Sequence, residues 1–501
     1  MTRTLACSTA LALVFSAQAA LAVTPEEVWD SWQALVTSAG QELTADTAAR
    51  NGDTLEVSYV VVTHEDELGG SSLVAIDKMD FTDNGDGTVL VTMSDEHLIQ
   101  LVFPEGVEGP STIKLSVNQP GMVITAGGSA TETSYEVSAP TTTVTLLEIL
   151  DQEGETLDTQ VEMVLADLSA SYLVTRDGDD AKLDSSFAAS RLTVDVAGTD
   201  KEGTGGGTMT LSIAGLEGAT KGNFLGAEIM ANMATALNGG FATDSTFSFG
   251  ALSAELDVTD GSGPVQASVA ATGGGFSVAL DKAKVDYGTS LTGLEMTVSG
   301  AEIPFPEVKV GLSEFGFGIM MPVTKSKTPQ DFGFTTRFVD FTVSEDIWGL
   351  IDPGTLLSRD PASLVIDIKG KGLWYEDIMD PSFDLEQVEA PGELHSLDLT
   401  EVLVKAAGAQ VAATGALAID NSKVDGFTGM PEPTGKIDVT ITGVNKLVDN
   451  LIALGLLPSD EAMGFRMMLG LFTRPGGAPD VVTSAIEFRD GGIFANGMPL
   501  Q

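Results

Sequence analysis

From Thr54 onward the chain is built from short runs of β-branched and aromatic residues separated by Gly, Asn and Asp. Such runs predict strands, because their side chains suit a pleated, half-buried surface and the intervening residues form turns. The first expected strands cover residues 55–63, 72–82, 88–94 and 98–103, in the order of a meander. The pattern has no constant repeat of about 20 to 50 residues, so it favours sheets over a solenoid.

Helix signals are few. Thr24, Pro25 and Glu27 have the spacing of a capping box with proline at the first helical position, and apolar residues including Val28 and Trp29 follow at helical spacing. Further helices are expected over residues 224–237, 444–457 and 460–472. The sequence therefore predicts a β-dominated α+β protein with large, twisted, mostly antiparallel sheets and a few amphipathic helices packed on one face.

The first 22 residues have the order of a cleaved export signal. Arg3 precedes an apolar stretch that ends in small residues. Cleavage fits before Ala20 or before Val23, and we favour Val23. Cys7 stands at the front of the apolar stretch, so lipid attachment is not expected. The expected domains are the signal peptide (1–22), an N-terminal helix with a β-rich unit (23–215), a helix with a β-rich unit (216–345) and a C-terminal β unit with a helix pair (346–501).

Composition limits the chemistry. Cleavage would remove the single cysteine, leaving no disulfide and no thiolate ligand or nucleophile. The formal net charge of -47 opposes binding to nucleic acid and to anionic membranes, which pair with Lys and Arg. No stretch after the signal has the roughly 18 to 20 apolar residues of a spanning helix, so no transmembrane segment is expected in the mature chain. The usual nucleotide, serine hydrolase and zinc protease motifs are absent from the sequence, and no cofactor is expected.

One pair of clusters could hold a metal ion. The first comprises His64, Glu65 and Asp66, followed by Glu67, and the second comprises Asp95, Glu96 and His97. In a three-stranded meander the ends of the first and third strands share an edge, about 10 Å apart at the backbone. Imidazole and carboxylate groups could then bind zinc, or carboxylates alone calcium. Two solvated acidic turns are the simpler interpretation.

The C-terminal half resembles an uncharacterised exported family of alphaproteobacteria, the domain of unknown function 2125. The matching residues are Trp348, Asp352-Pro353, Arg359-Asp360-Pro361, Gly415-Ala416-Leu417, Asp420, Gly435-Lys436-Ile437, Gly443, Gly455-Leu456-Leu457-Pro458 and Arg489-Asp490-Gly491. The resemblance implies an exported protein without assigned catalytic residues. The strand-rich ending is also similar to envelope proteins of the AsmA kind, whose long curved sheets shield lipid.

The functional expectation is a non-enzymatic periplasmic protein for binding or envelope maintenance. A mean hydropathy of +0.17 beside so large a charge means that much apolar surface must be hidden, in a core or in a groove for a lipid-like or other hydrophobic ligand. One alternative is a scaffold that binds an envelope protein and no ligand. Another is a glycan hydrolase that uses paired carboxylates, for which Asp346, Asp352 and Asp360 are the candidates.

Overall fold

In the computed structural model, strands dominate the chain. Residues 23–38, 40–66, 69–104, 109–129, 131–177, 180–200, 204–388, 390–424 and 431–500 are described. Strands account for 63% and helices for 12%, which confirms the predicted β-dominated α+β class. The predicted signal peptide and Glu67 lie outside the described residues.

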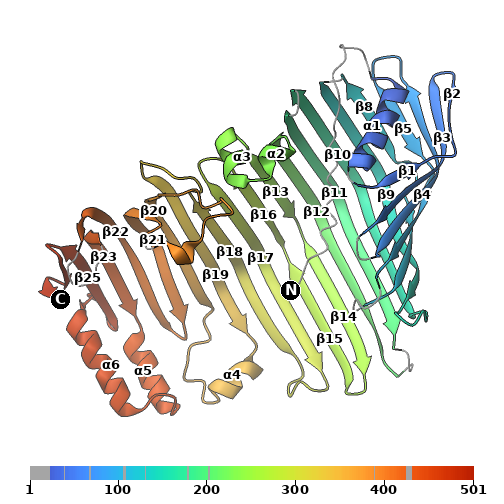
Figure 1. The fold of residues 1–501 in the computed structure, drawn as a ribbon. Helices are drawn as coiled ribbons and strands as arrows, with labels where there is room; N and C mark the ends of the chain where they lie inside the picture. The colour runs from blue at the N-terminus through green and yellow to red at the C-terminus, as the bar shows by residue number, and fades with distance from the viewer. Residues whose placement is uncertain are drawn as a thin grey trace. The chain divides into compact units, whose positions relative to one another are not determined.

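The chain forms two compact units (Figure 1). The N-terminal unit runs to Gly226 and includes Ala254–Pro264, and the C-terminal unit comprises Ala227–Ser253 and Val265–Gln501. The division expected after residue 345 falls inside the C-terminal unit, because the strands on either side of it pair with each other.

The described part of the N-terminal unit is a long antiparallel meander with one helix, α1 (Pro25–Ser38). Its strands are β1 (Glu42–Thr44), β2 (Thr47–Asn51), β3 (Thr54–Glu65), β4 (Ser71–Asp83), β5 (Val89–Met93), β6 (Glu96–Val102), β7 (Thr112–Asn118), β8 (Val123–Gly128), β9 (Glu132–Leu150), β10 (Thr159–Asp177), β11 (Asp180–Thr199), β12 (Gly206–Leu225) and most of β14 (Leu252–Asp260). The order across the sheet is β3, β4, the β5–β6 pair, the β8–β7 pair, β9, β10, β11 and β12.

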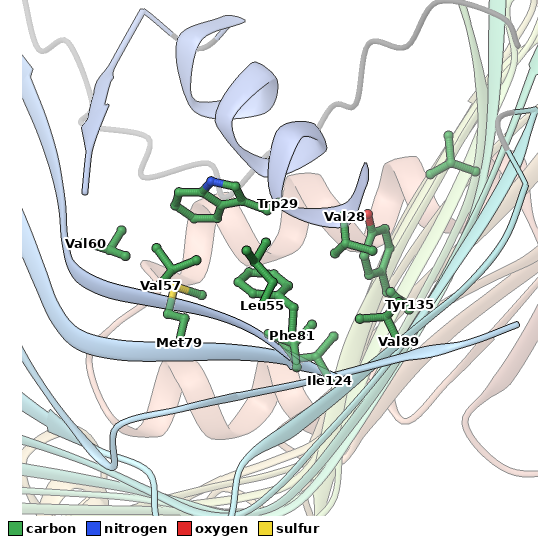
Figure 2. Packing of buried hydrophobic residues seen from close by; sticks show 13 residues of the cluster. Val28, Trp29, Leu55, Val57, Val60, Met79, Phe81, Val89, Ile124 and Tyr135 are labelled. Atoms are coloured by element: carbon green, nitrogen blue, oxygen red, sulfur yellow. The ribbon is translucent and has the colours of Figure 1, made fainter. Parts of the chain in front are cut away.

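Helix α1 provides the centre of the N-terminal core. The predicted capping box is confirmed: the Glu27 carboxylate accepts a hydrogen bond from the Thr24 backbone N–H at 2.9 Å, and the Thr24 hydroxyl accepts one from the Glu27 N–H. Val28 and Trp29 point toward the sheet (Figure 2). The core residues of the sheet are Leu55, Val57, Val60, Met79, Phe81, Val89, Val91, Ile124, Ala126, Tyr135 and Val174. They come from six neighbouring strands, about 24 Å across. Together with Val28 and Trp29 of α1 they form one hydrophobic cluster.

The C-terminal unit is a second antiparallel meander with helices at its strand ends. Its helices are α2 (Ala227–Met230), α3 (Met233–Gly239), α4 (Glu345–Ile351), α5 (Val444–Ala453), α6 (Ser459–Phe472) and the 3₁₀ turn η1 (Leu385–Gln387). Its strands are β13 (Thr243–Phe249), β15 (Gly263–Ala271), β16 (Gly273–Leu280), β17 (Val285–Gly300), β18 (Val308–Met321), β19 (Gln330–Val343), β20 (Ala362–Trp374), β21 (Gly392–Ala406), β22 (Ala409–Val424), β23 (Pro431–Thr442), β24 (Arg474–Pro475), β25 (Val481–Arg489), β26 (Gly492–Ala495) and β27 (Met498–Pro499).

The helix expected over residues 224–237 needs correction. Phe224 and Leu225 end strand β12, and helix formation begins only after Gly226, which has a φ of 78°. The helical stretch is then interrupted, because the Asn232 side chain accepts a hydrogen bond from the Thr235 N–H and starts α3 as a new helix. The two C-terminal helices are confirmed, although α5 ends at Ala453.

A line of backbone irregularities crosses each sheet. In the N-terminal unit Asp167 of β10, with a φ of 52°, lies opposite Ser190 of β11, which in turn lies opposite Gly215 of β12, with a φ of 61°. The Ser190 hydroxyl donates a 2.7 Å hydrogen bond to the Asp167 carboxylate. In the C-terminal unit Gly293 and Asp340 mark a similar line, with φ values of 60° and 55°. We call each line a crease.

The creases change the phase of side-chain alternation. Before Asp167 the residues on the apolar face of β10 are odd-numbered, such as Met163 and Leu165, and after it they are even-numbered, such as Tyr172 and Val174. The register of β10 with β11 is the same on both sides of Asp167, as the pairs Ala166 with Arg191 and Ser169 with Ala188 show. The alternation therefore reverses within the strands, at the irregular backbone of the crease, without a shift in pairing. Each long strand thereby keeps its apolar residues on one face over its whole length.

Candidate functional site

The register separates the two predicted metal-binding clusters. His64 lies opposite Ser72 of β4, and Ser72 lies opposite Leu101 of β6. His97 is four residues from Leu101 along β6, and two strand spacings separate β3 from β6, so the backbones of the two histidines are about 16 Å apart. The described residues contain no group of three or more His, Cys, Asp or Glu side chains placed to hold a metal ion.

The reason for this correction lies at Ser94 and Asp95. Strands β5 and β6 run in the same direction and both pair with β4 in nearly continuous register. Ser94 and Asp95 therefore interrupt what is otherwise a single strand. The Ser94 N–H still donates to the Lys78 carbonyl at 2.9 Å. Asp95, Glu96 and His97 therefore lie in the middle of the sheet, whereas Glu65 ends β3 and Asp66 follows it at the edge.

The carboxylate block after β19 is held by a buried ion pair. The fully buried Asp352 carboxylate accepts hydrogen bonds from the backbone N–H groups of Leu356 and Leu357 at 2.9 and 2.8 Å, and from Arg359 Nη1 at 2.5 Å. The Arg359 guanidinium also lies 4.6 Å from the centre of the Trp348 ring. Burial alone raises the pKa of Asp352, but these hydrogen bonds outweigh it and hold the pKa below its ordinary value.

The other candidate carboxylates have local roles. Asp360 accepts a 2.7 Å hydrogen bond from the Ser358 hydroxyl, and Asp346 lies in the first turn of α4. Asp352 has its oxygens committed to the loop that follows α4. The arrangement fits a structural lock, which we call the Asp352 lock.

The C-terminal sheet carries an apolar row across eight strands. The residues directly opposite one another, from β17 to β25, are Leu291, Phe315, Phe338, Leu364, Val404, Val411, Ile441 and Val482. Seven strand spacings make the row about 34 Å long. Phe338 is 40% exposed and Val404 is 44% exposed, so this part of the row is accessible to a ligand.

The N-terminal sheet carries a similar row. Its members, from β3 to β12, are Val60, Ile76, His97, Val117, Val144, Met163, Val194 and Leu211. Val60 also belongs to the core around α1, so the row lies on the same face of the sheet as that helix. Most of these side chains are half-buried. His97 is the one polar member of the row.

His97 is buried without a hydrogen-bond partner for either ring nitrogen among the described residues. Burial lowers its pKa, and the Glu96 backbone and the negative charges of Asp77 and Asp95 oppose that shift in part. The imidazole is therefore neutral near pH 7.

The opposite faces of both sheets are polar. In the N-terminal unit Lys221 pairs with Asp184 at 2.8 Å, and Thr210 donates to Asp195 at 2.9 Å. In the C-terminal unit Arg337 pairs with Glu314 at 2.6 Å. Each sheet thus has one apolar and one charged face. A shallow hollow of about 300 Å³ near Tyr59 and Lys78 is lined mainly by polar residues.

Sequence reasoning predicted the strands but not the rows. Alternation within a strand indicates which residues share a face, whereas the register across eight strands needs the pairing itself. The reversals at Asp167, Gly293 and Asp340 hide the signal further.

Comparison with known families adds one finding. Residues 336–501 match the family model DUF2125, described as an uncharacterized protein conserved in bacteria. This match supports the family resemblance inferred from the sequence, and it covers β20 to β27 together with the Asp352 lock and helices α4 to α6. No curated protein and no solved structure matches the chain.

Proposed function

We propose that the protein is an exported periplasmic binding protein, non-enzymatic, whose apolar sheet faces accommodate an elongated hydrophobic ligand such as a lipid chain. The observation that carries this proposal is the row of eight opposed apolar residues from Leu291 to Val482. Its accessible part includes Phe338, Val404 and Val411.

Physical chemistry favours an apolar chain as the ligand of this face. Burying apolar surface stabilises a complex by about 25 cal/mol per Å² before the costs of association. A row about 34 Å long, made of aliphatic and aromatic side chains, offers little hydrogen bonding and much contact area. The opposite face of the sheet is charged and suits contact with water. Only the apolar face is therefore proposed to bind the ligand.

The non-enzymatic part of the proposal rests on the carboxylates. Asp352 is buried against Arg359, and its hydrogen bonds hold the loop after α4.

No helix among the described residues is long and apolar enough to cross a membrane. Export is proposed from the order of residues 1–22, and sequencing the N-terminus of protein from a periplasmic fraction tests it, with Val23 as the expected first residue.

Displacement of a fluorescent fatty-acid probe tests the ligand. The double variant Val404→Gln and Val411→Gln places polar groups in the accessible part of the row, and we expect it to weaken probe binding by about ten-fold. The matched control is Thr414→Gln with Thr440→Gln, which lie on the opposite face of β22 and β23. Equal binding by both variants, or no binding by the full chain, would contradict the proposal and favour a scaffold without a ligand.

A further inference from the structure

Two helical insertions leave the C-terminal sheet at the same end of its strands. Helix α4 follows the end of β19, and α5 and α6 follow the end of β23. The register places both points together, because Phe341 lies opposite Ala362, Ser363 opposite Lys405, and Gln410 opposite Thr442. Figure 1 shows α4, α5 and α6 at this end of the strands. We call these three helices and the loop 352–358 the helical edge.

Helix α6 has large apolar side chains on its solvent-exposed side. The side that faces α5 carries Ala462, which is buried, and Arg466, which donates a 2.6 Å hydrogen bond to Asp449 of α5. The side away from α5 carries Met463 and Met467, which are 70% and 74% exposed, and Leu471. A helix that packs on a soluble core shows the opposite arrangement, with the apolar side inward.

The exposed apolar surface continues along the edge. Leu456, in the turn between α5 and α6, and Met468 are more than half exposed. On the α4 side, Leu350 is 69% exposed and Ile351 is also exposed. The two parts touch, because the Asn450 side chain of α5 donates a 2.7 Å hydrogen bond to the Leu356 carbonyl. Large exposed apolar patches on soluble proteins mark interaction sites.

Two buried or half-buried carboxylates anchor parts of the helical edge. The Asp352 lock fixes the loop after α4. The Asp480 carboxylate accepts hydrogen bonds from the backbone N–H groups of Asn445 and Lys446 at 3.1 and 3.0 Å, which fixes the first turn of α5. Neither anchor buries the apolar side chains of the helical edge. These side chains are therefore left free to contact another molecule.

Charge and side-chain type identify the partner. Residues 444–476, which contain α5 and α6, have three acidic side chains (Asp449, Asp460, Glu461) and three basic ones (Lys446, Arg466, Arg474). This part of the helical edge is therefore neutral in a chain of net charge -47, whereas α4 adds two acidic residues in its first turn. The exposed apolar side chains of residues 444–476 are Met and Leu together with Phe465 and Phe472, the types that interfacial helices place at the acyl boundary. Apolar side chains on a rigid helix about 21 Å long suit insertion into the acyl boundary of a bilayer.

We propose that the helical edge docks on a zwitterionic lipid surface, with α6 lying in the plane of the interface. Met463, Met467 and Leu471 enter the acyl region. The acidic charge elsewhere on the chain opposes an anionic surface. The proposed ligand-binding row lies on the sheet, one residue pair from these strand ends, and the docking surface lies on the helices.

Vesicle flotation tests the docking. We expect the full chain to float with phosphatidylcholine vesicles and the triple variant Met463→Gln, Met467→Gln and Leu471→Gln to lose association by about ten-fold or more. The control variant Leu147→Gln, Leu385→Gln and Leu394→Gln removes exposed leucines elsewhere and is expected to float as the parent does. Since all six side chains are exposed, both variants should keep the parent melting temperature.

Four outcomes would overturn the proposal. They are no flotation of the full chain, equal flotation of the triple variant and parent, flotation that increases when phosphatidylglycerol is added, and a self-association in sedimentation velocity that only the triple variant abolishes. The last result would assign the surface to a second copy of the chain. The Val404→Gln and Val411→Gln variant should still float, which separates docking from ligand binding.

Discussion

Arg359 Nη1 lies 2.5 Å from the Oδ2 atom of the fully buried Asp352 carboxylate, seven residues earlier in the chain. This contact closes the loop after α4, and the backbone N–H groups of Leu356 and Leu357 complete the coordination of the same carboxylate. The loop returns the chain to β20 while α4 remains at the edge of the sheet. Asp352, which the sequence offered as a candidate catalytic carboxylate, thus stabilises the loop after α4.

Replacing Asp352 should destabilise the C-terminal unit. Asp352→Asn removes the charge and leaves the Arg359 guanidinium without its closest anion, which is costly where one partner is buried. We expect the melting temperature to fall by on the order of 5–10 °C. Asp360→Asn, which changes a carboxylate directly after Arg359 that does not contact Asp352, is the control and should change it little. Equal melting temperatures for parent and Asp352→Asn would show that the lock is not structural.

Acid should release the helical edge. Burial alone raises the pKa of Asp480, but the N–H groups of Lys446 and Asn445 outweigh it and lower that pKa, and the pKa of Asp352 is likewise lowered. A lowered folded-state pKa stabilises the fold fully above the unfolded value of about 3.9, and this stabilisation is lost as pH falls through the folded pKa. We therefore expect the difference in melting temperature between parent and Asp480→Asn to be constant above about pH 5 and to shrink below pH 4. Thermal unfolding followed by circular dichroism from pH 2 to 7 measures it. A difference that widens in acid would contradict this sign.

Local signals explain which parts of the fold could be predicted. The capping box at Thr24 and Glu27 depends on residues three apart, so the sequence predicts the start of α1 correctly. Ser94 and Asp95 also have the composition of a turn, yet they form an interruption in a strand that continues along β4. That distinction depends on pairing with a distant segment. The predicted metal site failed for this reason, because its geometry required the chain to reverse at Asp95.

Exposed helical residues were harder to predict. Apolar residues in α6 predict a side packed on a core, as the sequence indicates for α1. In the structure Ala462 and Arg466 face α5, and Met463 and Met467 face outward. Arg466 pairs with Asp449 of α5, and this contact joins two helices whose relative position the sequence does not specify.

The crease of the C-terminal unit predicts a strict glycine position. Gly293 has a φ of 60°, and a Cβ atom there would lie 2.7 Å from Thr272 Oγ1. Gly293→Ala should lower the free energy of unfolding by about 1–3 kcal/mol, from the backbone strain and the contact together. Gly318→Ala is the matched control on the next strand, since its nearest neighbour would be 3.6 Å away. Urea unfolding compares the two variants, and an equal effect would mean that the crease tolerates a side chain.

His97 provides a test of the N-terminal apolar row. Its ring is buried between Ile76 and Val117 on the neighbouring strands, and burial is the main cause of its lowered pKa. Because the folded-state pKa lies below the unfolded value of about 6.5, the unfolded chain takes up the proton first, and stability falls as pH drops below that value. His97→Leu removes a buried polar group without a partner and completes the row, so we expect it to raise the free energy of unfolding by about 1 kcal/mol at pH 7. The gain should increase at pH 5, because protonation of the unfolded chain at His97 lowers the stability of the parent there and cannot affect the leucine variant. His64→Leu, which replaces a more exposed ring on the same sheet face, is the control. A gain for His97→Leu that is the same at pH 5 and pH 7 would mean that the imidazole is accessible to protons in the folded state, and that the row is open to water at its centre.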